Sequence, residues 1–255
     1  MADNALPSWQ EFKQVSAAGN AVWQATIEND SLLMKKDDGF YTSGNQIEQR
    51  FVLGTAVQAT TYGWRLGQEL YTASDIKLRP EEIAADDHPY AGWLYAGIFR
   101  EKAEATGHSL RLGLDLGCFG PCAGGSRTQT NMHRLLQQPL PQAWGAQLQR
   151  EWGAVLSAEM SPGRLLPLGG VDLTPYLKAR FGNIFTDAAA GASLRVGLLN
   201  TLPEQAANYG YLRAEVKAVA YNATLQGGYF NRQPSCIKPE RVVGELELGY
   251  LWRAE

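Results

Sequence analysis

The chain has 255 residues, of which 45% are hydrophobic and 19% charged, and its formal net charge is −3. This composition excludes a disordered chain, and the charge balance argues against sequence-independent binding of nucleic acid. No stretch approaches the ~20 apolar residues that a transmembrane helix needs. A membrane location would therefore require a closed β-barrel, in which the backbone amides are paired between strands.

The N-terminal residues, Met1 to Ala5, contain no basic stretch followed by an apolar core, so the sequence contains no signal peptide. Two interpretations follow: a cytosolic protein, or a mature chain from which the signal peptide has been removed.

Ten segments alternate between apolar and polar residues with the period of a β-strand. In segment 109–116, for example, four leucines alternate with Ser109, Arg111, Gly113 and Asp115. Each segment has about the ~10 residues of a transmembrane strand. In chain order, the predicted strands are 21–30, 46–54, 61–72, 92–102, 109–116, 150–160, 171–181, 191–199, 212–220 and 242–252.

Two features favour a membrane barrel over a soluble β-sandwich or a lipocalin-like barrel. The polar faces carry charges of both signs, which can pair inside the polar interior of a membrane barrel, whereas a small soluble barrel has an apolar interior. The connections also differ in length, as in outer-membrane barrels with short periplasmic turns and long outer loops. The short connections are 55–60, 103–107 and 161–165, and the long ones are 31–45, 73–91, 119–148 and 222–240. We therefore predict an all-β, antiparallel, up-and-down transmembrane β-barrel with both termini in the periplasm.

The long loops contain the candidate catalytic and metal-binding residues. Asn29 and Asp30 could supply oxygen ligands for Ca²⁺ or form an ordinary turn after a strand. A short helix is predicted over 126–136, with Ser126 as N-cap. Gln129 and His133 are four residues apart, so they share one face of this helix, and histidine is the usual general base. By itself, a loop histidine is more often simply solvated.

Known nucleophile signatures such as Gly-x-Ser-x-Gly and His-Glu-x-x-His are missing from the sequence. A hydrolase of this sequence would therefore attack with water, activated by histidine and a metal ion. His108 lies in a short turn and is expected to be inert. The cysteines Cys118, Cys122 and Cys236 lack the spacing of a zinc site. They are either incidental, or Cys122 and Cys236 form a bridge in an oxidising compartment.

Seven short motifs follow one another in an order and with a spacing that resemble the LpxR-type lipid A 3′-O-deacylase family, from Asn29 to Trp252. The motifs are Asn29-Asp30, Tyr41-Thr42-x-Gly44, Asp87-x-Pro89-Tyr90-Ala91-Gly92-Trp93, Gly120-Pro121, Gln129-x-x-x-His133, Gly182-Asn183-Ile184-Phe185-Thr186 and Asn222-Ala223-x-Leu225-x-Gly227.

The resemblance implies a monomeric barrel of twelve strands in the bacterial outer membrane, with a site between the wall and a loop helix. The implied reaction is calcium-dependent hydrolysis of the 3′-acyloxyacyl ester of lipid A, the lipid part of lipopolysaccharide. His133 would be the base and Asp30 the Ca²⁺ ligand, while Asn29, Thr42 and Gln129 would orient the site. The residues expected to contact the substrate are His88, Lys35, Lys36, Arg127 and Arg134, with Lys77 and Arg79 in the same outer loops.

Two departures from the family pattern stand out. His88 occupies the place where the family usually has arginine, and the closing hairpin after the tenth strand is missing. We therefore expect a single domain over 1–255 that lacks this hairpin, with 242–252 and 21–30 not fully paired. The alternatives to the deacylase are a non-catalytic outer-membrane barrel, such as a narrow pore or scaffold, and a soluble lipid-binding β-barrel.

Overall fold

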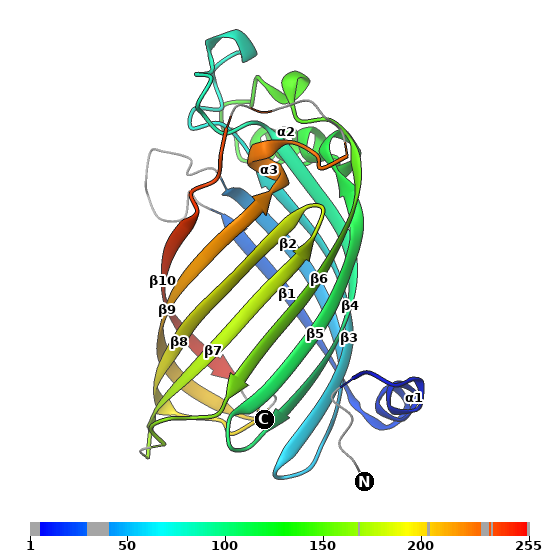
Figure 1. The fold of residues 1–255 in the computed structure, drawn as a ribbon, viewed down its shortest axis with the longest axis vertical. Coiled ribbons are helices and arrows are strands. Elements are labelled where there is room, and N and C mark those ends of the chain that lie inside the picture. The colour runs from blue at the N-terminus through cyan, green and yellow to red at the C-terminus, as the bar shows by residue number, and fades with distance from the viewer. Residues whose placement is uncertain are drawn as a thin grey trace.

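A computed structural model describes residues 6–29, 41–167, 169–202, 205–230, 235 and 237–253. Ten antiparallel strands follow one another in sequence order in one strongly curled sheet (Figure 1), which confirms the predicted fold class. The strands are β1 (Asn20–Asn29), β2 (Tyr41–Gly54), β3 (Gln58–Tyr71), β4 (Ala91–Glu104), β5 (His108–Phe119), β6 (Glu151–Pro162), β7 (Val171–Gly182), β8 (Phe185–Leu198), β9 (Ala207–Asn222) and β10 (Val242–Arg253). The described residues contain no helix long and apolar enough to span a membrane.

The inner face of the curled sheet carries the charged residues, and these are paired. Arg65 of β3 donates two hydrogen bonds of 2.8 Å to the carboxylate of Asp115 on β5. Lys178 of β7 lies 2.9 Å from Glu215 on β9. These pairs join strands that are not neighbours in the sheet, so they cross its concave side. This confirms the prediction that charges of both signs face a polar interior.

The outer face of the sheet is apolar and exposed. This outer wall carries large hydrophobic side chains on every strand from β1 to β10, as expected of a surface in contact with lipid. Exposed examples from successive strands are Trp23, Ile47, Trp64, Ile98, Leu116, Leu156, Leu177, Leu194, Leu212 and Leu248.

The two edges of the sheet are β1 and β10. Among the residues described, no ladder joins these two strands, as was expected from the sequence for 242–252 and 21–30.

The connections at the two ends of the barrel differ as predicted, with one exception. The described parts of the long loops and the helices α2 (Gly125–Leu135) and α3 (Ala223–Gln226) lie at the end of the barrel opposite the end of β10 (Figure 1). At this same end, however, β7 and β8 are joined only by Asn183 and Ile184. The side chain of Asn183 donates hydrogen bonds to Glu151 and to the carbonyl of Trp152, at 2.6 and 2.8 Å. This short turn is therefore held against β6.

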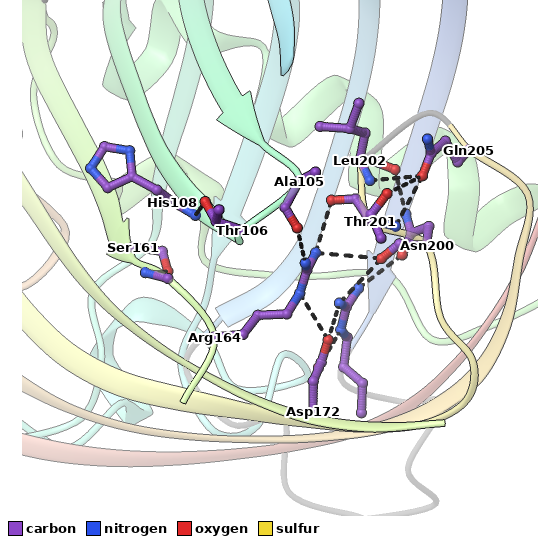
Figure 2. A network of polar contacts seen from close by, with 12 residues as sticks. Ala105, Thr106, His108, Ser161, Arg164, Asp172, Asn200, Thr201, Leu202 and Gln205 are labelled. Carbon is purple, nitrogen blue, oxygen red and sulfur yellow. Dashed lines mark hydrogen bonds and ion pairs between the residues drawn. The ribbon is translucent and has the colours of Figure 1, made fainter. Parts of the chain in front are cut away.

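Arg164 ties together three connections at the other end of the barrel (Figure 2). Its guanidinium donates to the carbonyl of Ala105 in the β4–β5 turn and, at 2.8 Å, to that of Thr201 in the β8–β9 connection. Arg164 itself follows β6, and its Nε lies 3.0 Å from the carboxylate of Asp172. Asp172 also binds Arg195, so one carboxylate balances two guanidinium groups.

Helix α1 (Trp9–Ala18) precedes the first strand and was not predicted from the sequence. It lies outside the wall, at the end of the barrel where the termini are found (Figure 1). The hydroxyl of Ser8 accepts a hydrogen bond from the backbone N–H of Glu11, which caps the helix. The Ser8-x-x-Glu11 spacing is a capping-box signal that could have revealed this helix.

Candidate active site

Helix α2 packs against the outer face of the wall, on β3 and β4. Gly92 of β4 and Gly125 of α2 allow this close approach. A Cβ on Gly92 would lie 3.0 Å from the Cβ of Ala123, and one on Gly125 would lie 2.9 Å from Leu70. The side-chain amide of Gln68 donates to the carbonyl of Ala123 at 2.7 Å. Since Gly92 belongs to the Pro-Tyr-Ala-Gly-Trp motif, part of that motif serves to seat the helix.

The start of α2 differs from the prediction. The helix begins at Gly125, and Gly124, with φ of +73°, occupies the N-cap position without a side-chain hydrogen bond. Ser126 is therefore not the N-cap, because the left-handed residue that reverses the chain is a glycine. A disulfide joins Cys118 at the end of β5 to Cys122, just before the helix, with Cα atoms 5.9 Å apart. This replaces both expectations for Cys122, namely an incidental thiol or a bridge to Cys236, which lies outside the described residues.

Gln129 points from α2 into the packed interface between the helix and the loops. Its side chain is 4% exposed, and its Oε1 accepts a hydrogen bond of 2.7 Å from the indole of Trp144. Within the described structure, its Nε2 has no hydrogen-bond partner. A buried donor without a partner costs about 1–3 kcal/mol. The amide of Gln129 is thus a free donor close to His133.

His133 lies one turn further along the same face of α2 and is partly exposed. Its Nδ1 is 2.6 Å from the carbonyl oxygen of Pro139, in the loop after the helix. A carbonyl oxygen can only accept, so Nδ1 carries the proton in the neutral ring. The other ring nitrogen, Nε2, then has a free lone pair and is the basic atom.

Thr42 lies beside the end of β1. It sits at an irregularity between Tyr41 and Ser43 in the pairing of β2 with β3, and its hydroxyl is buried 2.6 Å from that of Thr72. Thr72 follows Leu70, the residue that packs against Gly125 of α2, by two positions. The backbone of Asn29 pairs with Ser43, so Asn29 at the end of β1 lies beside the start of β2, where Thr42 is the second residue. Asp30 is the next residue and lies outside the described residues.

The predicted substrate-binding residues fall into three groups. Arg127 and Arg134 are exposed on α2, as are Lys77 and Arg79 in the loop after β3. Lys35 and Lys36 lie outside the described residues. His88 is buried instead, with 4% exposure.

His88 connects β3 to α3 at the loop end of the barrel. Its ring stacks on Tyr71 with centroids 5.6 Å apart, its Nδ1 lies 2.7 Å from the carbonyl of Pro89, and its Nε2 lies 3.4 Å from the hydroxyl of Thr224. Burial lowers the pKa of His88, although the Pro89 carbonyl and the charge of Asp87 act in the opposite direction.

Sequence reasoning missed the partners that fix the candidate site residues. They are Trp144 for Gln129, Pro139 for His133 and Thr72 for Thr42. Gln129 and Trp144 are 15 residues apart in the chain. No local pattern indicates such pairs, because each is created by packing between loops or strands.

A curled antiparallel sheet with a charged interior, an apolar outer wall and a loop helix seated on that wall defines an outer-membrane β-barrel. Comparison with known proteins gives the particular family. Residues 6–255 match the family model described as outer membrane protein LpxR, so the chain belongs to the LpxR family, a family of lipid A deacylases of the outer membrane. This confirms the resemblance, the class of enzyme and the cellular location predicted from the sequence.

One solved structure supports the fold. LpxR from Salmonella typhimurium is similar to this chain with a TM-score of 0.73 and 20% sequence identity, over 91% of this chain and 89% of that one. At this identity the likeness concerns the fold. A comparison with curated protein sequences gave no match.

Proposed function

We propose that this protein hydrolyses the 3′-acyloxyacyl ester of lipid A, with a water molecule activated by His133 and with Ca²⁺ as cofactor. The observation that carries the proposal is the contact between His133 Nδ1 and the Pro139 carbonyl. This contact leaves Nε2 as the basic atom on the partly exposed face of a helix seated against the lipid-facing wall. A soluble lipid-binding barrel, one of the alternatives, does not agree with membership of an outer-membrane family.

In the proposed reaction, His133 Nε2 takes a proton from water while the water oxygen attacks the ester carbonyl carbon. The negative charge moves to the carbonyl oxygen of the substrate. When the tetrahedral intermediate collapses, the bond to the sugar oxygen breaks and the protonated His133 returns its proton to that oxygen. The products are the free 3-acyloxyacyl acid and the 3′-hydroxyl of the sugar. The Pro139 carbonyl stabilises the imidazolium, because both ring nitrogens then carry protons.

The free amide of Gln129 fits a role in holding the substrate. Its Nε2 is a buried donor that Trp144 orients through Oε1. Because this atom is buried, an ester or hydroxyl oxygen would reach it only once the side chains that cover it move aside on substrate binding. Thr42 supplies a further hydroxyl at the β1–β2 side of the site.

The chemistry of the side chains around Thr42 agrees with Ca²⁺, which binds oxygen ligands. Thr42 and Thr72 bring two hydroxyl oxygens within 2.6 Å of each other, and Asn29, the last residue of β1, pairs with Ser43 beside Thr42. Among the described residues, no three His, Cys, Asp or Glu side chains gather in a metal-binding group. The ligand set would therefore be built around Asp30 and Asn29. When bound, the ion would polarise the ester carbonyl and stabilise the oxyanion.

Lipid A carries phosphates, and the exposed cations of the outer loops are suited to bind them. Arg127 and Arg134 are exposed on α2, and Lys35 and Lys36 follow β1 in the sequence, outside the described residues. We propose that these residues position the lipid A head group, and that the protein acts as a monomer on lipopolysaccharide in the membrane. His88 is buried, so we do not expect it to contact phosphate directly. Its role would be to hold the loop end of the barrel together, through Tyr71 and Thr224.

Mass spectrometry of lipid A from cells that make the protein tests this function. We expect a lipid A lacking the 3′-acyloxyacyl group, in amounts that depend on Ca²⁺ and fall to background with chelator. Asp30→Asn should raise the Ca²⁺ requirement or abolish turnover, since a ligand and its charge are both lost. Unchanged lipid A, with the protein folded in the outer membrane, would favour the non-catalytic barrel. Full activity in chelator would refute the metal.

A further inference from the structure

Helix α1 is fixed to the outer wall by an ion pair between Glu11 and the buried guanidinium of Arg100. The side chain of Arg100 on β4 points away from the barrel interior, on the same strand face as Ile98, which is 63% exposed. Arg100 is nevertheless only 2% exposed, because Glu11 of α1 covers it and accepts hydrogen bonds of 2.8 and 3.0 Å. The hydroxyl of Tyr62 also donates to Glu11 at 2.6 Å. These contacts hold α1 at a defined place on the lipid-facing wall.

An apolar groove lies between α1 and the wall. Its volume is about 490 Å³, within the range of roughly 300–1,000 Å³ that is usual for small-molecule sites. Aromatic rings form its outer side, with Trp9 and Phe12 stacked at 5.2 Å and Phe12 edge-on to Tyr62 at 5.5 Å. The side chains that line it are Pro7, Trp9, Phe12, Ile98, Leu112 and Leu156.

The groove covers the half of the wall nearest to the termini. Tyr62 lies four residues from the start of β3 at that end, and Leu156 lies at the middle of β6, so the groove reaches from that end to about mid-strand. Ile98 and Leu156 are also exposed on the wall itself, at 63% and 55%, so the groove is continuous with the surface in contact with lipid. With the short turns facing the periplasm, as expected from the sequence, this half of the wall would lie in the periplasmic leaflet, whereas α2 lies at the opposite end (Figure 1).

A cation and an aromatic residue mark the outer side of the groove. Trp9 is 67% exposed, and the ammonium group of Lys13 lies 5.4 Å from the centre of its ring. Tryptophan prefers the level of the lipid head groups, and lysines on amphipathic interfacial helices attract lipid phosphates. The apolar lining and the adjacent positive charge together match a lipid with a hydrocarbon chain and a phosphate.

We propose that this groove binds one acyl chain of a glycerophospholipid from the periplasmic leaflet, with its phosphate beside Lys13. The lipid would act as a structural ligand that fills the space between α1 and the wall. The site is separate from the deacylase site and does not depend on the proposed function.

Photo-crosslinking tests the proposal. The full chain is reconstituted in vesicles that contain a glycerophospholipid with a photoactivatable group on one acyl chain, and the labelled peptides are mapped by mass spectrometry. We expect peptides of α1 and of the β4–β6 wall to be labelled more strongly than the equally apolar face around Leu177 on β7. Ile98→Trp, which fills the groove, should remove this excess. Leu177→Trp, a matched change on the same wall, should leave it intact.

A second pair of variants tests the head group. Lys13→Gln should lower labelling of the groove about fivefold, the effect of losing one lysine contact with an anionic lipid surface, whereas Lys13→Arg should keep it. Equal labelling around the whole wall, or an excess that survives Ile98→Trp, would overturn the site. Labelling unaffected by Lys13→Gln would overturn the placement of the phosphate.

Discussion

The Nδ1 atom of His133 lies 2.6 Å from the carbonyl oxygen of Pro139, a residue only six positions further along the chain. The base and the group that orients it therefore belong to one short segment, the end of α2 and the turn that follows. The carbonyl of His133 itself accepts a hydrogen bond from the N–H of Gln138 at 2.8 Å, which holds the turn against the helix. The orientation of the proposed base thus depends on local geometry and not on a distant carboxylate.

We expect His133→Ala to reduce deacylation by at least ~10²-fold, because loss of a general base typically costs 10²–10⁴ in rate. His133 is partly exposed, so the barrel should still fold. The measurement is release of the 3′-acyloxyacyl group, with folding checked by heat-modifiable migration in gels. His108→Ala, a change at the exposed first residue of β5 on the other end of the barrel, is the control. Near-full activity of His133→Ala together with loss in His88→Ala would show that the wrong histidine has been assigned.

The Gln129→Glu variant tests the role of the Gln129 amide nitrogen separately from that of its oxygen. The variant keeps an oxygen that can accept from Trp144 but replaces the free Nε2 donor by a second acceptor. If this donor binds substrate, we expect kcat to fall by about 10²–10³, as for loss of an oxyanion-stabilising donor. Trp144→Phe removes only the orienting hydrogen bond and should have a smaller effect. Activity retained in Gln129→Glu but lost in Trp144→Phe would assign Gln129 a purely structural role.

His88 should make the loop end of the barrel sensitive to acid. Because burial lowers its pKa in the folded protein, the unfolded chain binds more protons than the folded one just below the ordinary histidine pKa of about 6.5. Stability therefore falls as the pH decreases below that value. Limited proteolysis of the loops should accelerate between about pH 6.5 and pH 5, where the unfolded histidine becomes protonated. In His88→Gln this pH dependence should disappear, and its persistence would contradict the assignment.

Glu11→Gln should weaken the attachment of α1. The change removes the carboxylate charge that pairs with Arg100; since Glu11 is itself 24% exposed, we expect a loss below the ~3 kcal/mol typical when one member of a buried pair is removed. The exposed Glu81→Gln is the control. Melting in detergent and protease cleavage before β1 should both respond to Glu11→Gln alone. Equal melting of the two variants would show that the ion pair contributes little.

The same pair has a predictable pH dependence. Burial by itself would raise the pKa of Glu11, but the hydrogen bonds from Arg100 and Tyr62 and the charges of Arg100 and Lys102 outweigh it, so the pKa is lowered. The stabilisation is therefore present above the unfolded pKa of about 4.3 and is lost as the pH falls through the lowered folded value. Helix α1 should detach only in acid.

The sequence by itself determined the strands and the class of barrel. Alternation such as that of 109–116 follows from the two-residue period of a strand, which is a local property of the backbone. The charges on the polar faces showed that the interior is polar, and all ten predicted segments are strands. The spacing of Gln129 and His133 likewise placed both on one face of a helix, because the helix period is also local.

Only the tertiary structure decided which groups these residues meet. Arg100 would be read as an interior residue or a misplaced charge on the lipid face, until Glu11, 89 residues away in the chain, is seen to cover it. Trp144 orients Gln129 because the loop folds back onto α2, and His88 is buried because α3 closes over it. A strand or helix period fixes the direction of a side chain relative to its own backbone. The partner depends on how distant segments pack, and that packing is not encoded in any local pattern.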